Sequence, residues 1–104
     1  MKVAVRFHQR IRQDVADVRR LWIGPRHEQH QWLKTILEIV RSELLKTGGS
    51  PVSSRRVGDS MHCWECVPRQ LWVVFHRTQR RRWWVWRQVD ITVLRIVRFD
   101  PFNP

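Results

Sequence analysis

The spacing of the apolar residues changes along the chain, and this change limits the possible folds more than any other feature. Between residues 11 and 46 the apolar positions recur every three or four residues, as on one side of a helix. Residues 2–7 and the part after residue 61 instead show alternation and short runs rich in Val, Ile, Trp and Phe, which are typical of strands. Because helical and strand-like elements come in blocks, the sequence predicts a single α+β domain over residues 1–104.

Two helices are predicted in the first half of the chain. The first begins at Ile11, and Gly24 and Pro25 separate it from the second, which covers about residues 29–46. Gly48 suits the left-handed residue that follows a helix. As a hairpin, the two helices would turn their apolar stripes toward the sheet. The side chains expected to be buried are Ile11, Val15, Val18, Leu33, Ile36, Leu37 and Val40.

The remaining apolar segments are predicted to form one sheet. Residues 48–60 are expected to be a polar loop, with later turns at 68–69 and at 79–81, and Val89-Asp90 is either a turn or a kink within one long strand. The N-terminal strand and the helix hairpin should pack on one face of an antiparallel sheet, leaving the other face open. The predicted strands are residues 2–7, 62–67, 70–77, 82–88 and 91–99.

The charge of the chain restricts its partners. Lys and Arg total 20 against nine acidic residues, which gives a formal net charge of +11. Such a field attracts nucleic acid, an anionic membrane or an acidic protein. No apolar run approaches the roughly 20 residues that span a bilayer, and the first ten residues lack the apolar core of a signal peptide. We therefore expect a cytoplasmic protein with reduced cysteines.

Four segments resemble the RelE/ParE toxin superfamily of bacterial toxin–antitoxin systems. They are "KVAVRFHQRIRQDVADV", "LEIVRSELLKTGGSP", "MHCWECVPRQLWVVFHRT" and "VDITVLRIVRFDPF". The resemblance implies a toxin that inhibits growth, either by cutting mRNA on the ribosome or by poisoning gyrase, and an antitoxin partner with an acidic segment. By position, Arg98 matches the arginine after the family's last strand, Phe102 falls near its C-terminal tyrosine, and Trp72 falls where a strand arginine is expected.

Four basic side chains could together form a site for acid–base cleavage of RNA; in the alternative interpretation, Arg95 and Arg98 are solvated or face a partner. His is the natural proton shuttle near neutral pH, and Arg stabilises the extra charge on a phosphate in the transition state. Strict alternation would place Thr92 and Ile96 on one face of the last strand, and Val93 and Arg95 on the other. The candidate catalytic residues are His76, Arg77, Arg95 and Arg98.

The stretch "RTQRRRWWVWRQ", residues 77–88, combines five arginines with three tryptophans. Arginine and aromatic rings can bind nucleic acid by charge and stacking. In the alternative interpretation, the tryptophans pack in the core and the arginines only solvate a turn. The candidate nucleic-acid-binding residues are Arg80, Arg81, Arg82, Trp84 and Arg87.

Cys63 and Cys66 form one CxxC motif, with His62 and His76 nearby in sequence. Zinc can be held by such ligands. A single pair is a weak signal, however, and in a strand the two cysteines point to opposite faces. We therefore predict no metal and no cofactor. The alternative to the toxin hypothesis is a non-catalytic basic module that binds nucleic acid or protein, or an inactive relative of the toxins.

Overall fold

The computed structural model describes residues 2–20, 25–66, 71–82 and 86–102, and it has the predicted α+β architecture. Two helices and five strands follow one another along the chain. They are β1 (Lys2–Phe7), α1 (Ile11–Arg20), α2 (Arg26–Thr47), β2 (Ser54–Gly58), β3 (Met61–Cys66), β4 (Leu71–Arg82) and β5 (Trp86–Val97). Neither helix has both the length and the apolar run needed to cross a membrane, among the residues described.

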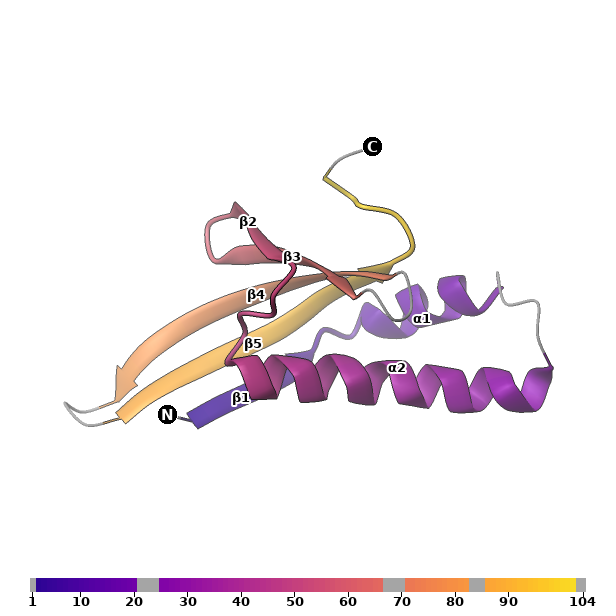
Figure 1. Cartoon of the computed structure of the whole chain (residues 1–104), viewed down its shortest axis with the longest axis horizontal. Helices are drawn as coiled ribbons and strands as arrows, with labels where there is room; N and C mark the ends of the chain where they lie inside the picture. Colours follow the sequence, from indigo (N-terminus) through magenta and orange to yellow (C-terminus); the bar gives the residue numbers. More distant parts are fainter. Residues whose placement is uncertain (1, 21–24, 67–70, 83–85, 103–104) are drawn as a thin grey trace.

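The five strands form one sheet in the order β1-β5-β4-β3-β2. The pairings from β2 to β5 are antiparallel, as predicted. The N-terminal strand makes the sheet mixed, because β1 runs parallel to β5 with Lys2 opposite Gln88 and Phe7 opposite Val93. The long β4–β5 hairpin therefore forms the middle of the sheet, and it extends beyond β2 and β3 (Figure 1).

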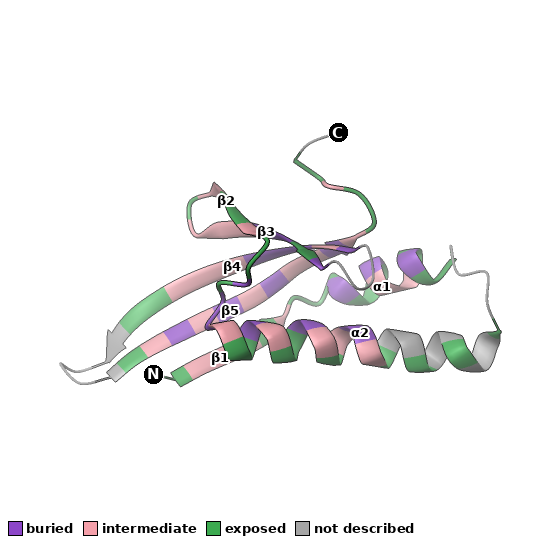
Figure 2. Ribbon diagram, viewed as in Figure 1, coloured by how far each residue is buried: buried purple, intermediate pink, exposed green. Residues whose placement is uncertain are grey.

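Both helices lie on the same side of the sheet, and the core fills the space between the helices and the sheet (Figures 1 and 2). Of the helix residues predicted to be buried, Ile11, Val18, Ile36 and Val40 are buried, and Val15 and Leu37 are half-buried. The side chain of Leu33 lies outside the described residues. The strands contribute Trp64, Cys66, Leu71, Val73, Phe75, Val89, Ile91, Val93 and Ile96 to the core.

Two predictions about the strands were wrong. The segment 48–60 was expected to be a loop, but Ser54–Gly58 forms the edge strand β2. An edge strand forms backbone hydrogen bonds with only one neighbouring strand, so its sequence need not alternate between apolar and polar residues. Residues 79–81 were expected to turn, but β4 continues to Arg82. The predicted strands 82–88 and 91–99 overlap one strand, β5 (Trp86–Val97), with Val89-Asp90 inside it, while Arg82 belongs to β4. Residues 83–85 and the predicted turn at 68–69 lie outside the described residues.

A β-bulge changes which side chains of β5 face the helices. Val74 is opposite Arg95, whereas Phe75 is opposite Val93, so Leu94 has no opposite residue in the β4–β5 ladder. An extra residue on one strand reverses the alternation beyond it. Val93 and Ile96 are therefore both buried in the core, and the predicted faces of this strand were wrong after the bulge. Arg95 consequently shares a face with Thr92.

The end of α2 joins the sheet through two glycines and an arginine. Gly48 adopts the left-handed conformation predicted for it, with φ 63°. Gly49 also has positive φ, 83°, and its N–H donates to the carbonyl of Leu44 at 2.9 Å. Arg77 Nε donates to the carbonyl of Gly48 at 3.0 Å. The helix end is thus closed by the backbone and held against β4 by Arg77.

Replacing Gly49 with Ala should destabilise the fold by about 2–4 kcal/mol. A Cβ at this position would lie 2.8 Å from Ile91 Cδ1 and 2.9 Å from Arg77 Cδ, on a backbone that already disfavours it. Gly58→Ala is the control, since its Cβ would meet nothing closer than 3.6 Å, and it should change stability by less than about 1 kcal/mol. Urea unfolding of both variants measures the difference; equal losses would contradict the packing described.

Candidate nucleic-acid interface

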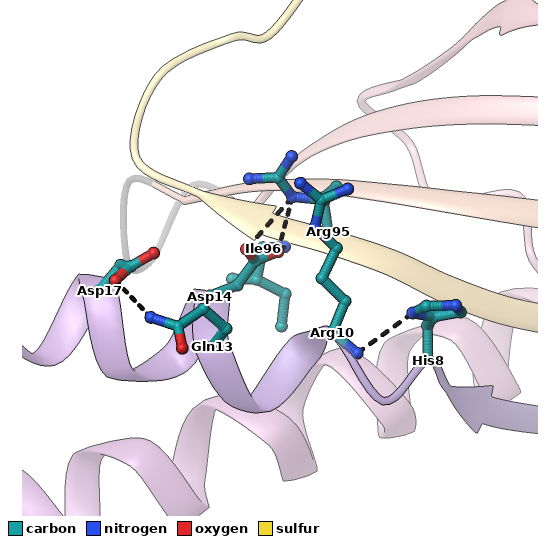
Figure 3. Close-up of polar contacts among 7 residues, drawn as sticks. All are labelled: His8, Arg10, Gln13, Asp14, Asp17, Arg95 and Ile96. Atoms are coloured by element: carbon teal, nitrogen blue, oxygen red, sulfur yellow. Dashed lines mark hydrogen bonds and ion pairs between the residues drawn. The ribbon is translucent and has the colours of Figure 1, made fainter.

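The carboxylate of Asp14 joins α1 to β5 at the bulge. It is buried, with 3% of the residue exposed. Asp14 Oδ2 accepts hydrogen bonds from Arg95 Nε at 2.9 Å and from the backbone N–H of Ile96 at 3.1 Å (Figure 3). Because β1 ends at Phe7, opposite Val93, Asp14 bonds to β5 beyond the last residue that β1 pairs with. The interaction fixes the position of α1 against β5 and the orientation of the Arg95 side chain.

A hollow of about 450 Å³ opens on the sheet face opposite the helices, which we call the outer face. Its floor is apolar and is formed by β3, β4 and the bulge of β5, while its rim carries positive charge. Figure 3 shows the guanidinium groups of Arg10 and Arg95 extending to the same side of β5. The residues that line the hollow are His8, Arg10, Met61, Val74, Leu94, Arg95, Pro101 and Phe102.

His8 and Arg10 reach the hollow because of how β1 ends. The N–H of His8 donates to the carbonyl of Val93 at 2.9 Å, continuing the parallel ladder by one residue. His8 Nδ1 then accepts from the N–H of Arg10 at 3.1 Å, and the carbonyl of Arg10 accepts from the N–H of Asp14 at the start of α1. The connection between strand and helix is thereby held by hydrogen bonds, and two basic side chains lie at one rim.

The C-terminal residues form the other rim. Asp100 is ion-paired with Arg55 of β2, and its Oδ1 accepts from the N–H of Phe102 at 2.9 Å. Although desolvation opposes ionisation, the hydrogen bonds from Phe102 and Arg55 hold the pKa of Asp100 below its usual value. The guanidinium carbon of Arg55 also lies 5.6 Å from the ring centre of Trp72. These contacts hold the C-terminal residues over part of the outer face, which was expected to be open.

Cys63 and Cys66 do not form a metal site with the histidines. Cys63 is opposite Val74 on the outer face, whereas Cys66 belongs to the core, and both are buried thiols. Burial, reinforced by the charge of Asp100, raises the pKa of the Cys63 thiol. His62 stacks on Phe75 at 5.4 Å, and desolvation lowers its pKa, with a smaller effect from Arg77. No cluster of metal-ligating side chains occurs in the described part of the chain.

The structure separates the four predicted catalytic residues. His76 is half-buried on the outer face opposite Thr92, and Arg95 lines the hollow. Arg77 lies on the opposite face, where it bonds to the end of α2. Arg98 follows β5 and is exposed. Arg95 is thus the member of this set that lines the hollow.

The predicted nucleic-acid-binding residues lie at the far end of the β4–β5 hairpin. Arg80 is exposed and pairs with Asp90 at 2.7 Å, and Arg87 is exposed. Hydrogen bonds from Gln88 and from Arg80 lower the pKa of Asp90. Arg81 and Arg82 belong to β4, but their side chains are not described, and Trp84 lies outside the described residues.

Sequence reasoning missed His8 and Arg10 as site residues. Both follow a predicted strand and precede a predicted helix, a place where loops commonly carry function. No motif marks them, because they join the hollow only through the pairing of β1 with β5. Comparisons with protein-family models, curated proteins and solved structures found no match.

Asp14→Ala should lower the free energy of unfolding by about 2–3 kcal/mol, because it leaves Ile96 N–H and Arg95 without their acceptor. Asp17→Ala on the same helix is the control. Asp17 pairs with Arg20 at 3.4 Å, but both side chains are more than half exposed, so its loss should change stability by about 0.5 kcal/mol or less. Chemical denaturation distinguishes the two, and equal small effects would show that Asp14 does not hold α1 to the sheet.

Proposed function

We propose that the chain is a growth-inhibiting toxin of the RelE type, acting in the cytoplasm, which binds RNA in the hollow and cleaves mRNA on the ribosome. One observation carries the proposal: Arg10 and Arg95 line the same hollow over an apolar floor. Guanidinium groups bind phosphates with good geometry, and an apolar floor suits a nucleobase. The net charge of +11 favours the same class of ligand.

The side chains around the hollow suggest a division of roles. Arg95, oriented by Asp14, would bind the phosphate that reacts, and Arg10 would bind the same or a neighbouring phosphate. His8 lines the hollow and could transfer a proton. The ring of Phe102 is available for stacking, as the resemblance implies for this position. His76 and Arg98 remain candidates for contacts with the strand on either side.

Arg10→Gln should reduce mRNA cleavage by about 100-fold, since it removes one positive charge aimed at the phosphate. The protein and the variant are each expressed from an inducible promoter in bacteria, and cut sites are mapped on ribosome-bound mRNA. Arg41→Gln is the charge-matched control, because Arg41 is exposed on α2, on the helix side of the sheet.

Growth arrest with normal mRNA and blocked supercoiling would favour gyrase poisoning. Absence of arrest would favour a non-catalytic module or an inactive relative.

The toxin hypothesis also requires an antitoxin. A groove of about 640 Å³ lies where β1, α1 and α2 meet, and its apolar residues are Phe7, Ile11, Val15 and Leu37, with the basic side chain of Arg12 beside them. An amphipathic acidic segment would complement both features. Such a partner would also reduce repulsion among the arginines.

Co-expression with the product of an adjacent small reading frame should give a soluble complex, whereas the isolated chain should aggregate or self-associate. Size-exclusion chromatography after co-purification measures this. Val15→Glu in the groove should release the partner because it adds a like charge to an acidic segment, while Val52→Glu, at a position that is 99% exposed, should not. A monodisperse chain with no affinity for the neighbouring product would count against the toxin hypothesis.

A further inference from the structure

One carboxylate holds the C-terminal segment against the outer face. We call residues 98–102, which follow β5, the tail. Asp100 Oδ2 accepts a hydrogen bond from the guanidinium of Arg55, and its Oδ1 accepts from the N–H of Phe102 at 2.9 Å. Because Arg55 belongs to β2, this ion pair joins the tail to the edge strand of the sheet. The side chain of Asp100 is only 10% exposed, whereas that of Arg55 is 44% exposed.

Arg55 and Arg95 lie at the two ends of one row of side chains on the outer face. The row crosses four strands, and its consecutive members are direct partners in the ladders: Arg55, Cys63, Val74 and Arg95. Neighbouring strands are about 4.8 Å apart, so three steps separate the backbones of the two arginines by roughly 14 Å. The two guanidinium groups are therefore placed to bind phosphates of one single strand that crosses the sheet.

Each of these arginines is bound by an aspartate, but the two aspartates differ. Asp14 is buried on α1 and also accepts from the backbone N–H of Ile96, so it holds the fold together. Asp100 lies in the tail, and its ion pair is with a side chain that remains partly exposed. A phosphate offers a guanidinium the same oxygen acceptors with more charge than a carboxylate. Asp100 is thus bound to Arg55 as an anionic ligand would be.

We propose that Asp100 occupies an anion subsite on Arg55, and that a phosphate of single-stranded RNA displaces it when the tail lifts. The guanidinium carbon of Arg55 lies 5.6 Å from the ring centre of Trp72, so an aromatic surface for an adjoining base is next to the subsite. The inference rests on the proposed binding of RNA in the hollow, because Pro101 and Phe102 of the tail line that hollow. Lifting the tail extends the hollow from Arg95 toward Arg55.

Cys63 can report whether the tail is lifted. It lies on the outer face and is fully buried, although both helices are on the other side of the sheet. Burial raises the pKa of its thiol, and the charge of Asp100 adds to this effect, so the tail lies close to it. Cys66 is buried in the core instead. Lifting the tail should therefore expose Cys63 alone, whereas unfolding would expose both thiols.

The first measurement is the rate at which iodoacetamide labels each cysteine of the full chain, with the label assigned by fragmentation mass spectrometry. Asp100→Asn and Arg55→Gln each break the ion pair, and both should label Cys63 at least about fivefold faster than the unmodified chain. Cys66 should be unchanged. The two substitutions act oppositely on the thiol itself, because Asp100 raises the pKa of Cys63 and Arg55 lowers it.

Two labelling results would overturn the proposal. Faster labelling of Cys63 in Asp100→Asn but slower labelling in Arg55→Gln would show an effect of charge on the thiol alone. Equal acceleration at Cys66 would show that the ion pair holds the whole fold and that the tail does not lift separately.

The second measurement is the affinity of each protein for a fluorescent single-stranded RNA octamer, by anisotropy over a range of salt concentrations. Asp100→Asn should bind more tightly, by the factor by which its Cys63 labelling rises, because the fraction of open chain limits both. Arg55→Gln also opens the tail but lacks the subsite, so it should bind at least about tenfold more weakly than Asp100→Asn. Its logarithmic salt slope should fall by about 0.7, the value for one phosphate of a single strand.

Two control variants match these changes in charge. Glu65→Gln removes a carboxylate from an exposed position of the outer face, opposite Trp72. Arg56→Gln removes an arginine from the exposed position next to Arg55 on β2. Neither touches the ion pair, so each should keep the labelling rate of Cys63. An effect on RNA affinity equal to that of the matched tail variant would show attraction to overall charge and reject the subsite.

The hollow variant Arg10→Gln separates this proposal from the proposed function. Weaker RNA binding in Arg10→Gln, with both tail variants like the unmodified chain, would reject the Arg55 subsite and keep the hollow. Unchanged RNA affinity in Arg10→Gln, with weaker binding in Arg55→Gln, would instead reject the proposed function and keep the subsite.

Discussion

The buried carboxylate of Asp14 is the interaction on which the arrangement of the hollow depends. It accepts from the N–H of Ile96 and from Arg95, and so ties α1 to β5 at the bulge. Without an acceptor, a buried backbone N–H and a partly desolvated guanidinium would both oppose folding. The same contact sets the direction of Arg95 and the start of α1, which in turn places Arg10 at the rim. Stability and the shape of the candidate site thus share one polar group.

The bulge at Leu94 brings the two hydrogen-bond donors, Arg95 Nε and the N–H of Ile96, to this carboxylate. The bulge turns the side chain of Ile96 into the core and that of Arg95 to the outer face. Of these two consecutive residues, Arg95 therefore supplies a positive charge to the hollow and Ile96 packs in the core. The C-terminal residues then bind across β2 through Arg55 and Asp100, and they close the hollow on the other side. A sheet face without a covering helix is in this way partly covered by a short tail, whose residues Pro101 and Phe102 line the hollow together with the buried Val74.

Local patterns predicted the helices, their buried stripes and the left-handed residue at Gly48, because each depends on neighbours within a few residues. They failed for Ser54–Gly58, since an exposed edge strand leaves no apolar pattern. They also failed for the faces of β5 beyond Leu94, because a bulge is defined by the partner strand. His8 and Arg10 could not be found as site residues, since they meet Arg95 only through pairing between the two ends of the chain.

That pairing between the ends has a consequence for biosynthesis. β1 ends at Phe7, but its partner β5 starts at Trp86, so β1 has no partner strand until all the residues between them have been synthesised. At about 5–20 residues per second, this delay is on the order of 5–20 s, during which the helices lack their sheet. The hollow is lined by residues on both sides of this long interval, His8 and Arg10 before it and Arg95 and Phe102 after it, so it cannot form until Phe102 has been synthesised. A surface that acts on ribosomes, as proposed, would therefore be assembled only after β5 itself has been synthesised.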